Sequence, residues 1–241
     1  MSIEYEEIDS IYLRNEPIYE IIRKCNDDVL IVEIFSKEYG SNDFVLFYFS
    51  DSVKSEKIIH EKIIQLTNEY AQQNAVVIGA CKKSIPIIDK KFVELKNQFD
   101  LVFENLTETQ FEDLVEACYG TKSGEIHGES SDWILLKSKN DNLCYVISAE
   151  GDSINVVSEL ISEKLKQKLP KDNAKKTNMI WSLEKQDSDS LIMSDVATSI
   201  NKISEGIEAV TEIEVKLWYN FQNKNLVKKF KLVCVFSFIE I

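Results

Sequence analysis

Glycine is scarce in this sequence, which contains only seven glycines among 241 residues. That is about 3% of the chain, against a usual share of about 7%. Loops that cradle phosphate groups depend on glycine, because the anion must approach bare backbone N–H groups closely. The chain contains none of the glycine-rich patterns typical of mononucleotide-binding, dinucleotide-binding or α/β-hydrolase sites. The scarcity therefore argues against the common glycine-dependent classes of enzyme.

Histidine and clustered cysteine are also lacking. His60 and His127 stand alone, and the five cysteines are widely spaced, with no C-x-x-C pair. A zinc site needs several such ligands close together, and a serine or cysteine nucleophile needs a nearby histidine base. We expect His60 on a helix in a packing or surface role and His127 in an exposed link. Glu184, Asp187 and Asp189 lack the spacing of a calcium loop and are interpreted as turn residues. The sequence predicts no catalytic residue, no metal site and no cofactor.

Positive charge is in deficit, because Lys and Arg number 28 against 41 Asp and Glu, for a net charge of −13. A chain this acidic repels nucleic-acid phosphates and anionic membrane surfaces, so we expect neither as a partner. No apolar run approaches the roughly 20 residues of a membrane span, and the acidic start of the chain has no signal-peptide pattern. Scattered cysteines, odd in number, are typical of buried free thiols in a reducing compartment. We therefore expect a cytoplasmic protein.

The first half of the chain reads as alternating strands and helices. Apolar runs at 29–35 and 44–49 predict strands buried on both faces, as in a sheet covered by helices. The first 27 residues carry helix-like apolar spacing at Ile18, Ile21 and Ile22. Alternation of strand and helix favours right-handed crossovers and a mostly parallel sheet flanked by helices. The further elements expected are helices at 53–73, 89–97 and 109–119 and strands at 75–81 and 99–104.

Residues 120–132 hold three of the seven glycines and are the candidate domain boundary. We expect an α/β domain at 1–125 and an α+β domain with a mixed sheet at 133–241. The last two strands, at 213–221 and 229–238, are joined by a short polar link and are expected to form a hairpin. The other elements expected in this half are strands at 143–148 and 178–183 and helices at 154–169 and 194–209.

The order of these elements resembles that of the tubulin/FtsZ superfamily, whose members join a nucleotide-binding α/β domain to a smaller α+β activation domain. The C-terminal half carries the better resemblance. Tyr145–Ser153 followed by a helix, then Met179–Leu183, and finally Lys231–Phe238 are similar to successive elements of the family. In the N-terminal half, the run at 44–49 and the two strands after it resemble the family's fourth, fifth and sixth strands. The resemblance implies a tubulin/FtsZ-like fold.

The resemblance also implies a glycine-rich phosphate loop after the fourth strand, and at this point the sequence departs from the family. The corresponding stretch, 50–56, contains no glycine and places carboxylates where the phosphates would lie. Only 43 residues precede Phe44, too few for the two earlier phosphate loops of the family. The degenerate loop includes Ser50, Asp51, Ser52, Lys54 and Glu56.

A vestige of the family's catalytic loop would fall near residues 129–132. In the family, acidic residues of this loop reach the nucleotide of the neighbouring subunit. Glu129 and Asp132 are the candidate acids in this chain. The alternative interpretation is an acidic surface loop.

The retained element order and the degenerate loop together predict a non-catalytic tubulin/FtsZ-like protein. We expect it to bind a protein partner, with a filament-forming relative as the candidate, and to regulate or join a cytoskeletal or cell-division assembly. One alternative is an unrelated two-domain α/β enzyme or small-molecule-binding protein. Its site would lie at the carboxyl ends of the N-terminal strands, near Ser50–Ser52 and Cys81–Lys83. Another alternative is a homo-oligomer formed through the C-terminal sheet edge.

Overall fold

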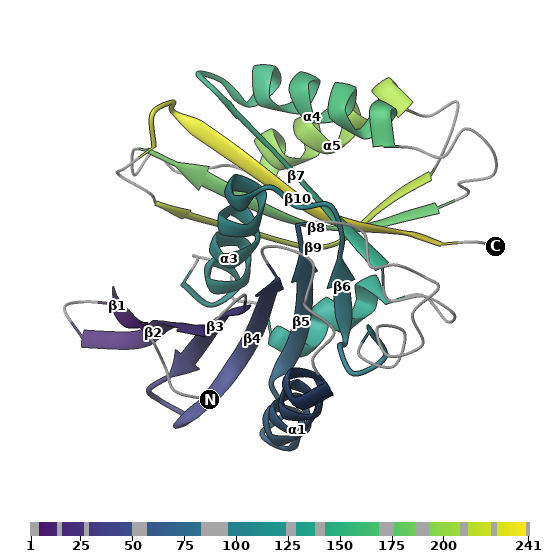
Figure 1. Ribbon diagram of the computed structural model, residues 1–241. Coiled ribbons are helices and arrows are strands. Elements are labelled where there is room, and N and C mark those ends of the chain that lie inside the picture. The colour runs from purple at the N-terminus through teal and green to yellow at the C-terminus, as the bar shows by residue number, and fades with distance from the viewer. Residues whose placement is uncertain are drawn as a thin grey trace. The chain divides into compact units, whose positions relative to one another are not determined.

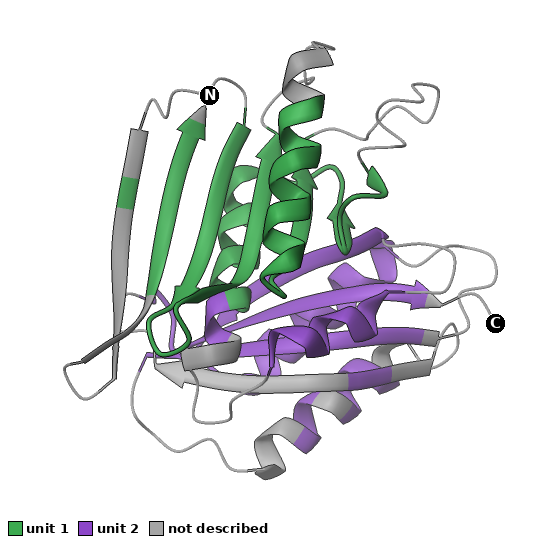
Figure 2. Cartoon of the chain, turned by 90° about the horizontal axis from the view of Figure 1, so that it is seen from below, with its two compact units in different colours: residues 1–118 green, residues 119–241 purple. Residues whose placement is uncertain are grey.

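The chain divides into two compact units, which we call unit 1 (residues 1–118) and unit 2 (residues 119–241; Figure 2). Each unit contains its own sheet, and each is described by itself. The computed structural model describes residues 5–13, 16–26, 29–49, 57–82, 96–123, 129–137, 143–168, 176–186, 193–207, 212–222 and 226–239. Among the helices in these ranges, none is long and apolar enough to cross a membrane.

The sheet of unit 1 has the strand order β1-β2-β3-β4-β5-β6 (Figure 1). Strands β1 to β4 form an antiparallel meander, whereas β4, β5 and β6 run parallel to one another. Helix α1 connects β4 to β5, and helix α3 follows β6. The bounds are β1 Tyr5–Leu13, β2 Glu16–Asn26, β3 Val29–Ser36, β4 Ser41–Phe49, α1 Lys57–Gln72, β5 Val76–Cys81, β6 Leu101–Phe103 and α3 Glu108–Ser123.

Strand β4 is buried on both faces, which confirms the prediction from its unbroken apolar run. Successive side chains of a strand point to opposite faces. Phe47 packs against Tyr70 of α1, with ring centroids 6.3 Å apart, whereas Tyr48 stacks on Phe111 of α3 at 4.4 Å. Helix α1 therefore covers one face of the sheet and α3 covers the other. The predicted helix at 89–97 falls largely outside the described residues.

Two expectations for unit 1 are wrong. Residues 5–13 and 16–26 form strands β1 and β2 rather than a helix, and the sheet, expected to be mostly parallel, has three antiparallel pairs against two parallel ones. Ile21 lies opposite Ile34 of β3 and is buried. Its apolar contact is thus made across the sheet, and such pairing overrides a weak local helical spacing.

Unit 2 has a four-stranded mixed sheet in the order β7-β10-β8-β9, as expected for an α+β arrangement. Strand β10 is antiparallel to both β7 and β8, and β9 is parallel to β8. Helices α4 and α5 pack on one face, around a core that includes Ile161, Trp181 and Ile203. The bounds are β7 Leu143–Gly151, α4 Ile154–Lys168, β8 Lys176–Lys185, α5 Met193–Ile207, β9 Glu212–Gln222 and β10 Phe230–Ile239.

The predicted closing hairpin is wrong, because β9 and β10 are not neighbours. Strand β10 lies between β7 and β8, and β9 pairs with β8. The residues from Leu232 to Ser237 are all buried, so this strand needs partners on both edges and cover on both faces. Only a central position in the sheet supplies both. The short link between β9 and β10 therefore does not make them neighbours.

The other face of the unit 2 sheet contacts a short 3₁₀ helix, η1 (Ser130–Leu136). Trp133 and Leu136 of η1 are fully buried. The side-chain amide of Asn178 in β8 donates to the Leu135 carbonyl at 3.0 Å, and the Ser237 hydroxyl donates to the Leu136 carbonyl. Polar side chains of the sheet thereby satisfy carbonyl groups at the end of η1.

Candidate functional site

The candidate site is the edge of the unit 1 sheet at which β4, β5 and β6 end. Ligands of open α/β sheets bind outside the carboxyl ends of parallel strands. Main-chain hydrogen bonds continue past the strand ends at this edge. The Lys82 N–H donates to the Phe49 carbonyl, and the Leu106 N–H donates to the Cys81 carbonyl, both at 3.0 Å. The degenerate loop 50–56 and Lys83 lie outside the described residues, so their role stays a prediction.

The antiparallel meander brings a second link to this edge, which sequence reasoning missed. Val29 lies opposite both Asn26 of β2 and Phe49 of β4, so the end of β2 and the start of β3 lie at the same edge. The link between them is Asp27-Asp28, which lies outside the described residues. The signal was present, because Asn-Asp-Asp between two apolar runs is typical of a turn. The turn was overlooked because the apolar spacing at Ile18, Ile21 and Ile22 was interpreted as helix-like.

Two lysines that the structure describes at this edge each face a carboxylate. Lys82 Nζ lies 3.5 Å from Glu108 Oε1, and Lys96 Nζ lies 3.7 Å from Glu104 Oε1. The Lys82–Glu108 pair is exposed, and such a pair stabilises a fold by only about 0–1 kcal/mol, whereas Lys96 and Glu104 are partly buried. Their importance is electrostatic, because both of these described lysines already have a negative neighbour that weakens their attraction for a phosphate.

The start of α3 at this edge carries its own cap. Thr107 Oγ1 accepts from the Gln110 N–H at 3.2 Å, and Gln110 Oε1 accepts from the Thr107 N–H at 3.0 Å. This reciprocal arrangement is a capping box. Glu108 also places a negative charge in the first turn, where it complements the helix dipole. A helix start with these groups in place is a poor site for an added anion.

Cys81, the last residue of β5, is buried at the same edge. Burial is the main cause that raises the pKa of its thiol to about 12, and the nearby Glu104 carboxylate raises it further while Lys96 acts in the opposite direction. A thiol with so high a pKa stays neutral near pH 7, and the neutral thiol is a poor nucleophile. The geometry therefore gives Cys81 a packing role.

Glu129 and Asp132, the candidate catalytic-loop acids, lie at the start of η1. Asp132 Oδ2 accepts from the Glu129 N–H at 3.0 Å, and the Ser131 hydroxyl donates to Glu129 Oε2 at 3.3 Å. Both carboxylates thus bind groups of their own turn, as capping residues do. A role of these acids toward a nucleotide stays a prediction.

The other singled-out residues do not gather at one place in the part of the chain that the structure describes. Glu184 was interpreted as a turn residue, but it lies in β8, fully buried and 3.8 Å from Lys231. Asp187, Asp189 and His127 fall outside the described residues, and so does the side chain of His60 in α1. Within the described ranges, no group of three or more His, Cys, Asp or Glu residues could hold a metal ion.

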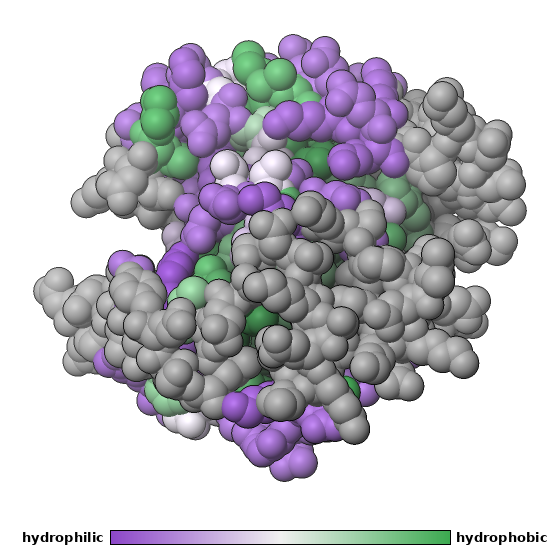
Figure 3. Space-filling view, in the orientation of Figure 1, coloured by the Kyte–Doolittle hydropathy of each residue, from purple (hydrophilic) through white to green (hydrophobic). Residues whose placement is uncertain are grey.

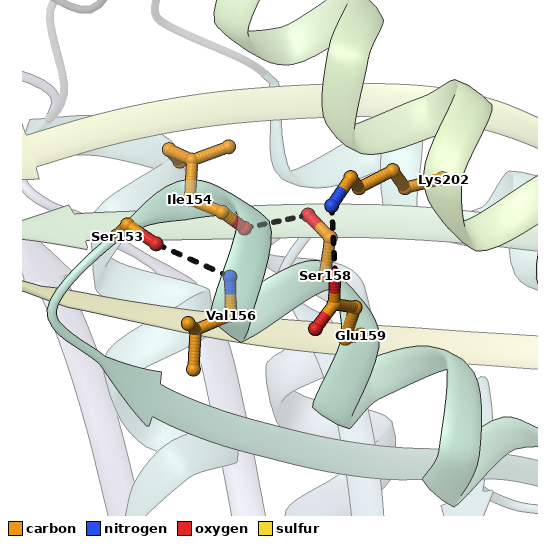
Figure 4. Close-up of polar contacts among 6 residues, drawn as sticks. All are labelled: Ser153, Ile154, Val156, Ser158, Glu159 and Lys202. Atoms are coloured by element: carbon orange, nitrogen blue, oxygen red, sulfur yellow. Dashed lines mark hydrogen bonds and ion pairs between the residues drawn. The ribbon is translucent and has the colours of Figure 1, made fainter.

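The turn between β7 and α4 lies within one of the stretches singled out in the sequence, and Figure 4 shows polar contacts of this turn and of α4. Ser153 Oγ accepts from the Val156 N–H at 3.3 Å, which caps α4. Lys202 of α5 pairs with Glu159 of α4 at 2.8 Å. The surface over these helices is mainly hydrophilic, with small hydrophobic areas (Figure 3). Val156 and Leu160 are exposed there.

Known proteins resemble this chain in structure but not detectably in sequence. No protein-family model matches it, and no curated protein sequence matches it. An empty FtsZ dimer from M. jannaschii superimposes with a TM-score of 0.55 at 12% identity, covering 81% of this chain and 63% of that one. A tryptophan-to-tyrosine mutant of FtsZ from the same organism gives 0.52 at 15% identity, covering 82% and 65%. GDP-bound monomeric CetZ1 from Haloferax volcanii gives only 0.40 at 9% identity, covering 74% and 59%.

These matches define the class of fold. The chain is a mixed α/β protein with an FtsZ-like fold, at the level of architecture that the element order predicted. It spans less than two thirds of the length of the FtsZ chains that it matches. At identities of 12% and 15%, the likeness concerns the fold alone.

Proposed function

We propose that this chain is a non-catalytic FtsZ-like protein that acts by binding another protein within a cytoskeletal or cell-division assembly. The observation that carries the proposal is the electrostatic character of the edge formed by β4, β5 and β6. Lys82 and Lys96 are compensated by carboxylates, and the start of α3 is capped by its own side chains. The links that meet this edge add the acids Asp27, Asp28, Asp51 and Glu56 against the lysines Lys54 and Lys83.

Such an edge opposes the binding of a nucleotide's phosphates. A unit negative charge 4 Å from a carboxylate is repelled by about 4 kcal/mol at the effective dielectric constant typical of a protein surface. Phosphate sites overcome this cost with several converging N–H groups or with cations. The described residues at this edge contribute few such groups. The balance of charge at this edge therefore supports a protein that neither binds nor hydrolyses a nucleotide there.

The direct test is nucleotide binding measured by isothermal titration calorimetry with Mg²⁺ present. We expect no saturable heat for GTP or GDP at concentrations up to the millimolar range. CetZ1, whose structure holds GDP, serves as the positive control. A dissociation constant in the micromolar range for either nucleotide would refute the non-catalytic proposal and favour the alternative of an enzyme or small-molecule binder.

The partner is proposed to be a filament-forming FtsZ-like protein from the same cell. The support is the shared fold, together with the fact that one similar FtsZ structure is a dimer. Co-sedimentation of the purified chain with polymers of that relative should place the chain in the pellet at saturable stoichiometry. The chain alone, centrifuged in parallel, should stay in the supernatant. If the chain pellets equally with and without polymer, self-association rather than partner binding is at work, and light scattering would then give the size of the homo-oligomer.

A further inference from the structure

We draw no further inference here: the strongest candidate, the exposed apolar pair Val156 and Leu160 on the outer face of α4 in unit 2, carries nothing because no contact or charge pattern among the described residues shows what covers it.

Discussion

Gly79, in the middle of β5, is a glycine that the packing of unit 1 requires. A Cβ added at this position would lie 2.6 Å from Cδ2 and 2.8 Å from Cγ of Phe99. The Phe99 ring is itself enclosed, because it is 2% exposed and its centroid lies 5.7 Å from that of Phe47 and 6.2 Å from that of Phe49. Since several ring atoms are too close, a small rotation cannot relieve the overlap. The substitution Gly79→Ala must therefore displace the ring or the strand.

The magnitude follows from two opposing effects. Overpacking a core by one methyl group typically costs about 1–3 kcal/mol. Alanine also restricts the unfolded chain more than glycine does, and this stabilises the fold by about 0.4–1 kcal/mol. Steric overlap is the larger effect at this position, because real Cβ atoms essentially never approach another heavy atom within 3.0 Å. We expect Gly79→Ala to lower the free energy of unfolding by about 1–2 kcal/mol, the difference between the two effects.

Equilibrium urea unfolding of four proteins tests this reasoning: the parent, Gly79→Ala, Phe99→Leu and the double variant. Because the smaller leucine makes room for the new methyl group, the double variant should be more stable than the sum of the two single effects predicts, by about 0.5–3 kcal/mol. Gly40→Ala is the matched control. Its Cβ would meet nothing within 4 Å, but its φ of +64° is unfavourable for alanine, so it should destabilise the fold without coupling to Phe99. Strict additivity of Gly79→Ala and Phe99→Leu, or a gain in stability from Gly79→Ala, would refute the steric account.

Two further predictions concern buried ionisable groups of unit 1. Glu33 is 5% exposed, and its Oε1 accepts hydrogen bonds from both Lys24 Nζ and the Tyr70 hydroxyl at 2.6 Å. Tyr70→Phe should therefore lower the free energy of unfolding, measured in urea, by about 1.5–3 kcal/mol. A decrease below about 0.5 kcal/mol would show that the hydrogen bond from the hydroxyl contributes little. Burial raises the pKa of Cys81 from an ordinary value of about 9 to about 12, so its contribution to stability is fully present below about pH 9 and is lost as the pH rises toward 12. Melting temperatures measured across this range should fall less steeply for Cys81→Ala than for the parent, and equal slopes would contradict the assignment.

Local signals predicted the parts of the fold that depend on local contacts. The unbroken apolar run of β4 and the helical stripe of α1 are each visible in the sequence, so the β4–α1–β5 crossover was predicted correctly. The strands at the start of the chain were missed because β2 is defined by its pairing with β3 rather than by its own apolar spacing. The position of β10 between β7 and β8 was missed for the same reason. The length and composition of the loop before a strand do not indicate which strands it will pair with.

The candidate site was predictable only in part. Lys82 was placed at the carboxyl end of a strand, but its partner Glu108 lies 26 positions away and gives no local signal. The cap of α3 did have a signal, because Thr107-Glu108-Thr109-Gln110 follows the pattern of a capping box. Recognising it would have shown that this helix start is occupied by its own side chains.

The topology of unit 1 bears on the proposed loss of nucleotide binding more directly than the composition of one loop does. If the strand beside β4 were parallel to it, that strand would end at the candidate site and could lead into a helix whose N-terminal N–H groups face a phosphate. Strand β3 is antiparallel to β4, so it begins there instead, after a link of only two residues. Two residues leave no room for a helix start, and both are aspartates. Glycines introduced within 50–56 would therefore still face an edge at which the neighbouring link supplies carboxylates in place of a second helix start.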